Sequence, residues 1–166
     1  MSKTQPAAYS PVHIFLHWVI AALIVFQLVF GESIKDLGRA LRDTGAPDTL
    51  TTVMGNAHIW VGVTVLVLTL LRLLIRARFG VPAPVPASRI QELAARVVHG
   101  LLYLLMIVVP ITGLLAWYGG IREAGDLHEL AKPLFIILIL LHVAGALYHH
   151  FALKDRTMKR MITSRI

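Results

Sequence analysis

The chain alternates between long apolar segments and shorter stretches that are rich in charged residues, Gly or Pro. The apolar segments cover residues 14–30, 58–75, 97–117 and 130–148. A helix of about 20 residues crosses the hydrocarbon core of a bilayer, which is about 30 Å thick. The pattern therefore predicts an all-α protein, a transmembrane four-helix bundle that fills residues 1–166 as a single domain.

The polar connections predict no second domain. A 27-residue connection, 31–57, contains Gly38, Gly45 and Pro47, and 12 residues separate the last two apolar segments. The sequence GVPAPVP, which starts at Gly80, predicts a stiff and extended linker, because Pro lacks the N–H that continues a helix.

The composition indicates that the bilayer is the solvent of this chain. Hydrophobic residues make up 57% of it, charged residues make up 15%, and the mean hydropathy is +0.72. The first apolar segment is longer than the core of a signal peptide and lacks an Ala-x-Ala-like cleavage site, so we expect it to be retained. The chain has no Cys, which excludes disulfides, iron–sulfur clusters and covalent haem attachment within it.

The distribution of Lys and Arg predicts the orientation, because these residues concentrate in the cytoplasmic segments of membrane proteins. Eleven lie near the termini and the second connection, and five lie in the other two connections. Both termini should therefore be cytoplasmic, with a formal charge of about +9 inside and −2 outside. This asymmetry explains the basic composition, so we assign no nucleic-acid partner. The first group is Lys3, Arg72, Arg76, Arg78, Arg89, Arg96, Lys154, Arg156, Lys159, Arg160 and Arg165, and the second is Lys35, Arg39, Arg42, Arg122 and Lys132.

Four histidines predict two cofactor sites at different depths. His128 and His142 are 14 residues apart, which returns to nearly the same helix face after about 21 Å of rise. In this topology His58 shares the external level with His128, and His17 shares the internal level with His142. Two imidazoles on facing helices can take the two axial positions of a haem iron. We therefore expect His58 with His128, and His17 with His142, to hold two haems.

Other residues near these histidines fit the same arrangement. Arg72 lies 14 residues after His58, at the internal level, where its guanidinium could pair with a haem propionate. Gly62, Gly113 and Gly145 could leave room for a flat macrocycle. The alternatives are that Arg72 extends to the lipid headgroups and that the glycines serve close helix packing.

The remaining histidines carry weaker predictions. We expect His13, His149 and His150 to have interfacial positions at the helix ends. His99 starts the third segment at the internal level, where it could relay protons to a quinone at a site shared with His149 and Arg72.

The histidines have two alternative interpretations besides haem binding, a zinc site and a transport pathway. Zinc needs three or four ligands at one tetrahedral point, which the separation of His128 from His142 opposes. A transporter or proton channel lined by histidines is the other alternative, because Pro110 could break the third helix.

The histidine-bearing segments resemble the bacterial cytochrome b561 family, and most closely its superoxide oxidase branch. The resemblance covers nearly the whole chain. It rests on IFLHWVI around His17, GNAHIWVGVTVLVLTLLRLLIR around His58, HGLLYLLMIVVPITGLL from His99, and LLHVAGALYHHFALKDRTMKRMI around His142.

The resemblance implies two haem b groups, with ligands at the positions matched by His17, His58, His128 and His142. It also implies a multi-pass protein of the bacterial inner membrane, a superoxide:ubiquinone oxidoreductase that oxidises superoxide at the external face and reduces ubiquinone. One departure is the external charge of about −2, since a positive surface would attract an anion faster. The alternative function is a cytochrome b anchor and electron conduit for a separate dehydrogenase or hydrogenase.

Overall fold

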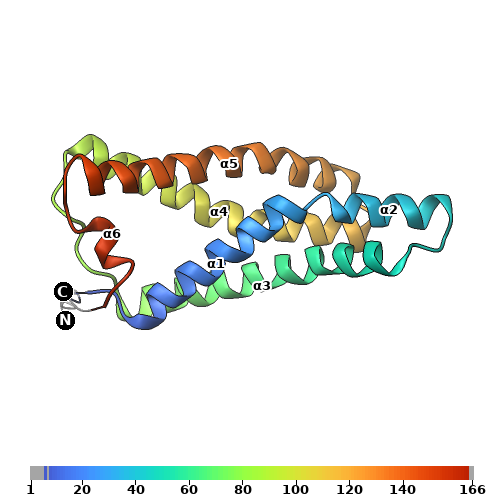
Figure 1. Ribbon diagram of the computed structural model, residues 1–166, viewed down its shortest axis with the longest axis horizontal. Helices are drawn as coiled ribbons and strands as arrows, with labels where there is room; N and C mark the ends of the chain where they lie inside the picture. The colour runs from blue at the N-terminus through green and yellow to red at the C-terminus, as the bar shows by residue number, and fades with distance from the viewer. Residues whose placement is uncertain (1–5, 7, 165–166) are drawn as a thin grey trace.

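The computed structural model describes residues 6 and 8–164 and is helical, with no strand in that part of the chain. The helices are α1 (Pro11–Phe30), α2 (Ser33–Asp43), α3 (Thr49–Phe79), α4 (Arg89–Gly119), α5 (Arg122–Phe151) and α6 (Thr157–Arg160). Helices α1, α3, α4 and α5 are long and apolar enough to cross a membrane. They lie side by side, with α2 at one end of the bundle and α6 at the other (Figure 1). The predicted transmembrane four-helix bundle is confirmed.

The helices extend further than the apolar segments, which corrects the predicted connections. The 31–57 connection contains α2 and the first nine residues of α3. Asp48 starts α3 early, because its side chain accepts a hydrogen bond from the Thr51 N–H and caps the helix. The predicted 12-residue connection between the last two segments shrinks to Gly120 and Ile121, so His128 lies inside α5 and not before it.

Helix α2 is held against α3 by a close contact. Leu37 is buried, and a Cβ placed on Gly55 would come within 2.5 Å of its Cδ2 atom. Only Gly at position 55 allows this approach. The side chain of Ser33 also donates a hydrogen bond of 3.1 Å to the Met54 carbonyl. This end of the bundle therefore carries a packed helix where the sequence predicts only a connection.

The connection between α3 and α4 has no regular structure over residues 80–88, as its Pro content predicts. Gly80 ends α3 with φ of +74°, a conformation that favours Gly. Ser88 and Gln91 form a capping box that starts α4.

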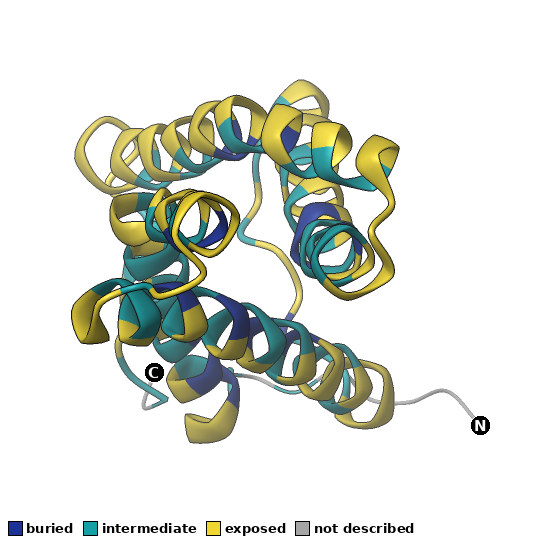
Figure 2. Cartoon of the chain, turned by 90° about the vertical axis from the view of Figure 1, so that its right-hand side faces the viewer, coloured by how far each residue is buried: buried dark blue, intermediate teal, exposed yellow. Residues whose placement is uncertain are grey.

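A central apolar core separates the two ends of the bundle. Phe135 lies at its middle, seven residues after His128 and seven before His142. Thr69 is fully buried and its hydroxyl contacts the Met106 sulfur at 3.7 Å. Figure 2 shows the buried residues on the inner sides of the helices, so many large apolar side chains are left to face lipid. The buried core residues are Ile20, Val65, Leu105, Met106, Ala131, Phe135 and Leu138.

The segment after α5 folds back over the end of the bundle where α1 begins (Figure 1). The Trp18 indole N–H donates to the Met161 carbonyl at 2.7 Å. Arg160 donates to the Ala83 carbonyl at 2.6 Å. This shared end is what the prediction of two cytoplasmic termini requires. Lys3 and Arg165, which entered the charge count, lie outside the described residues.

Asp155 fastens this segment to the end of α5. Its Oδ2 atom lies 2.5 Å from His149 Nδ1, and its Oδ1 atom accepts from the Thr157 N–H at 2.8 Å. Burial of the Asp155 carboxyl favours its neutral form, but the hydrogen bonds from His149 and Thr157 outweigh burial and lower its pKa. The contact is thus present at neutral pH and is lost only as the pH falls through the lowered pKa.

We expect Asp155→Asn to release the segment at neutral pH, because the neutral amide loses the charge-assisted contact with His149. Trypsin should then cleave after Lys154 or Arg156 several-fold faster than in the wild type, as measured by intact mass against time. Asp43→Asn, at the opposite end, is the matched control. Equal cleavage rates in all three proteins would contradict this role.

Candidate functional site

The end of the bundle that carries α2 holds one facing pair of histidines. The rings of His58 on α3 and His128 on α5 have centroids 5.9 Å apart and planes at 76°. His128 Nδ1 lies 2.8 Å from the Val109 carbonyl. A carbonyl oxygen only accepts, so Nδ1 carries the proton and Nε2 keeps a lone pair. A histidine that binds a metal through Nε2 needs this tautomer.

Neighbouring residues make close contacts with this pair. A Cβ on Gly113 would lie 2.9 Å from His128 Cε1, so Gly is required for the ring to sit there. The Gln27 amide donates to the His58 carbonyl at 2.8 Å. His58 Nδ1 and Gln27 Oε1 are buried and have no hydrogen-bond partner among the described residues. Gln27 is not among the predicted site residues, although an amide within the apolar segment 14–30 is a usable signal of a functional position.

A second facing pair lies at the other end. The rings of His17 on α1 and His142 on α5 have centroids 6.1 Å apart. Arg72 reaches this level, as predicted from its spacing, and its guanidinium donates to His17 Nδ1 at 3.0 Å. It also lies over the Tyr103 ring, 5.9 Å from the centroid.

The other predicted site residues are not all brought together. His99 does approach the pair of His17 and His142, with its ring centroid 4.9 Å from that of His142. His149 instead contacts Asp155, outside this group. His13 lies in the first turn of α1, at a helix end as predicted, but it is only 4% exposed and its Nε2 atom has no partner among the described residues.

The two histidine pairs have the separation that a shared metal atom requires. With metal–nitrogen bonds of about 2 Å, two imidazoles on one metal have ring centres about 6 Å apart. In the described part of the chain, no three His, Cys, Asp or Glu side chains gather as a metal-ion site. At the level of His17 and His142, nothing described lies within 4 Å of a Cβ on Gly145, three residues after His142. Facing histidine pairs, one of them next to open space, fit a flat macrocycle such as haem.

Comparison with known proteins decides the family. Residues 8–164 match the family model described as prokaryotic cytochrome b561. The chain belongs to the prokaryotic cytochrome b561 family. It is 40% identical to "Cytochrome b562" of Cereibacter sphaeroides, over 98% of this chain and 99% of that one. It is 32% identical to "Probable superoxide oxidase CybB" of Yersinia pestis, over 93% of this chain and 95% of that one.

Membership in the cytochrome b561 family gives the general function. The protein is a membrane cytochrome that transfers electrons, and its cofactor is haem b. The predicted family is confirmed. The histidine pairs are the residues that fit such a cofactor, because no Cys is present to attach haem covalently.

Ion pairs cover the α2 end of this cytochrome. Lys35 lies 3.3 Å from Glu32 and 3.2 Å from Glu129, and Lys132 lies 2.6 Å from Glu32. Hydrogen bonds from Lys132 and Lys35 lower the pKa of Glu32, and those to Glu129 and Glu32 raise the pKa of Lys35. Glu32 is also close enough to His58 to interact with it electrostatically. Lys35 and Lys132 are thus neutralised beside the pair of His58 and His128.

Proposed function

We propose that this cytochrome binds two haem b groups, one between His58 and His128 and one between His17 and His142. It transfers electrons from superoxide on the α2 side to ubiquinone on the side where α1 begins. In balance, two superoxide ions become two dioxygen molecules, and one ubiquinone takes up two electrons and two protons to become ubiquinol. The count of eleven basic residues against five supports an inner-membrane orientation with both termini cytoplasmic.

The single observation that carries the proposal is the presence of two facing histidine pairs on one bundle. Both pairs use α5, through His128 and His142, and the 14 residues between them span about 21 Å. Haem b, when bound, supplies one-electron redox chemistry that the side chains lack. The apolar core around Phe135 keeps water out between the two levels.

The residues around the pairs have separate roles. The Val109 carbonyl holds His128 in the tautomer whose Nε2 can bind iron. Arg72 now donates to His17 Nδ1, and this contact is incompatible with a proton on that nitrogen. When His17 binds iron through Nε2, we therefore expect the Arg72 guanidinium to leave His17 Nδ1. It would then donate to a carboxylate such as a haem propionate.

The external charge pattern is compatible with a small donor. Histidines would fill both axial positions at the outer level, so the donor needs no coordination site on iron. The Lys35 and Lys132 ion pairs reduce long-range attraction of an anion, so we expect a weaker salt dependence than a bare basic surface would give.

The test is steady-state kinetics of the haem-loaded protein in detergent. Superoxide is generated enzymatically, a short-chain ubiquinone is supplied, and ubiquinol is measured. We expect ubiquinol to form, and added superoxide dismutase to stop it. If ubiquinol forms only after a soluble dehydrogenase or hydrogenase is added, the protein is an electron conduit for that partner, and the superoxide proposal is wrong.

A further inference from the structure

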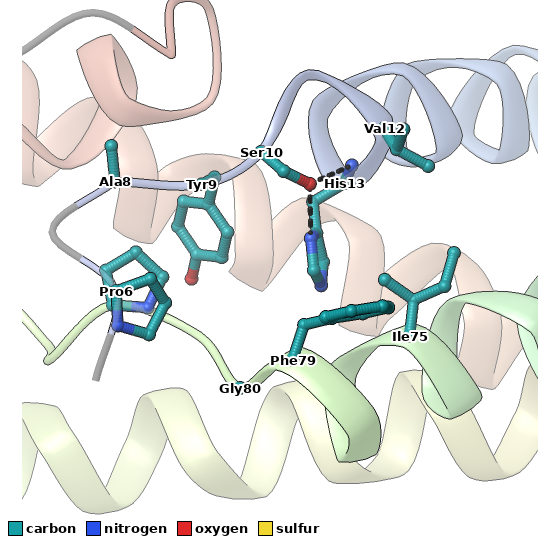
Figure 3. Close-up of a pocket in the computed structure, with 10 residues that line it drawn as sticks. Pro6, Ala8, Tyr9, Ser10, Val12, His13, Ile75, Phe79 and Gly80 are labelled. Carbon is teal, nitrogen blue, oxygen red and sulfur yellow. Dashed lines mark hydrogen bonds between the residues drawn. The ribbon is translucent and has the colours of Figure 1, made fainter. Parts of the chain in front are cut away.

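A cavity of about 360 Å³ lies beside the start of α1, apart from both histidine pairs. It is bounded by the segment before α1, the first turn of α1 and the end of α3 (Figure 3). Its walls are mainly apolar, and its size is within the usual range for small-molecule sites. The residues that matter most here are Tyr9, Ser10, His13, Ile75 and Phe79.

His13 provides a polar group inside this apolar cavity. Its ring points toward Phe79 in Figure 3, it is 4% exposed, and its Nε2 atom is buried without a partner among the described residues. A buried polar atom without a partner is costly, so a ligand that satisfies it binds favourably.

The contacts of Ser10 are compatible with the tautomer of His13 in which Nε2 carries the proton. The Ser10 hydroxyl oxygen accepts from the His13 backbone N–H at 3.3 Å, as an N-cap does. The same oxygen lies 2.9 Å from His13 Nδ1. Its own proton is then free to be donated to Nδ1, and in that tautomer the imidazole proton is on Nε2. In that tautomer the cavity presents one N–H donor between apolar and aromatic walls.

This arrangement selects a flat, uncharged ligand with a carbonyl oxygen. We propose that the cavity binds the head group of ubiquinone, with His13 Nε2–H donating to one carbonyl oxygen. The inference rests on the proposed function and adds the position of its electron acceptor. That position differs from the site near His99, His149 and Arg72 that the sequence predicted.

The cavity is next to the inner histidine pair. His13 precedes His17 by four residues, one helical turn with about 6 Å of rise, on the same face of α1. Arg72 and Arg76 are close enough to His13 to interact with it electrostatically. Positive groups here favour the negative charge that a quinone oxygen gains on reduction. The two electrons come from superoxide, and the two protons come from water at the exposed edge beside Ser10.

The first test compares His13→Phe with His13→Gln in the haem-loaded protein. Phe removes the donor and Gln keeps one. We expect the ubiquinone KM to rise about tenfold in His13→Phe, which is the loss of one buried hydrogen bond, and much less in His13→Gln. His150→Phe, at an exposed position, is the matched control. Haem content should equal that of the wild type in all three variants.

The second test is independent of turnover. The haem-loaded protein is photolabelled with an azido-ubiquinone, and the labelled peptides are mapped by mass spectrometry. We expect labels within residues 6–16 and 73–82, removed by excess ubiquinone. Labels confined to peptides with His99 or His149, or an unchanged ubiquinone KM in His13→Phe, would contradict the proposal that ubiquinone binds in this cavity. A wild type that holds two haems but never reduces ubiquinone contradicts the proposed function, and the labelling pattern still tests the cavity.

Discussion

Ubiquinone reduction is expected to fall at least about 100-fold when His142 is replaced by Ala. Mutation of a residue that hydrogen-bonds to a metal ligand lowers metal affinity or activity by tenfold to about 100-fold, and loss of the ligand itself should have a larger effect. His142 faces His17 across 6.1 Å and has His99 as its other ring neighbour. Without it the inner pair cannot supply two axial ligands, while the outer pair of His58 and His128 is untouched.

The readouts of His142→Ala are the haem content and the reduced visible spectrum, alongside ubiquinol formation. We expect about one haem per chain, still reducible by superoxide, and almost no ubiquinol. His150→Ala is the control, since His150 is exposed on the same helix. Full haem content with normal turnover in His142→Ala would remove His142 from the ligand set. The loss of both haems would indicate that the bundle fails as a whole.

The second large effect is expected from Gly113→Val, which changes no histidine. A Cβ on Gly113 would lie 2.9 Å from His128 Cε1 and 3.0 Å from its Nδ1, so the ring must move. That movement breaks the 2.8 Å contact with the Val109 carbonyl, which sets the tautomer of His128. We therefore expect selective loss of the outer haem and of superoxide oxidation.

The effect of Gly113→Val can be separated from helix destabilisation. Gly100→Val is the matched control on α4, because nothing described lies within 4 Å of a Cβ there. Gly113→Ala should give an intermediate loss, since it adds only the Cβ. Haem content and superoxide-driven reduction should be normal in Gly100→Val. If Gly113→Val binds as much haem as Gly100→Val, the close fit of His128 has no role in cofactor binding.

The sequence predicted the bundle because hydrophobic length and spacing are strong signals in a membrane chain. The same periodicity placed His58 beside His128, and His17 beside His142. It also placed Arg72 at the inner level, because 14 residues return to nearly the same helix face. Topology was enough to predict these contacts, but it also grouped His149 with His99 and Arg72, whereas His149 contacts Asp155.

The parts that were not predicted depend on local polar contacts and on tertiary packing. The sequence predicts only a connection where α2 lies. Ile34, Leu37 and Leu41 have helical spacing, but the apolar face they form is narrow and is interrupted by Gly38. The early start of α3 depends on the Asp48 cap, a short signal outside the apolar segment.

The burial of His13 depended on tertiary packing in the same way. The end of α3 covers His13, and no pattern within α1 shows which face the neighbouring helix will cover. The partner of His149 was missed for a similar reason. Asp155 lies beyond the helix, and its contact depends on how the chain turns back after α5.

The most direct test of the account is the haem content of the detergent-purified protein, measured by pyridine haemochrome with oxidised and reduced spectra. The account predicts two haem b groups per wild-type chain and about one in His58→Ala, because that variant removes one axial ligand of the outer pair only. A wild-type chain with one haem or none, or a His58→Ala chain that keeps both, would contradict the two-level arrangement of the histidine pairs.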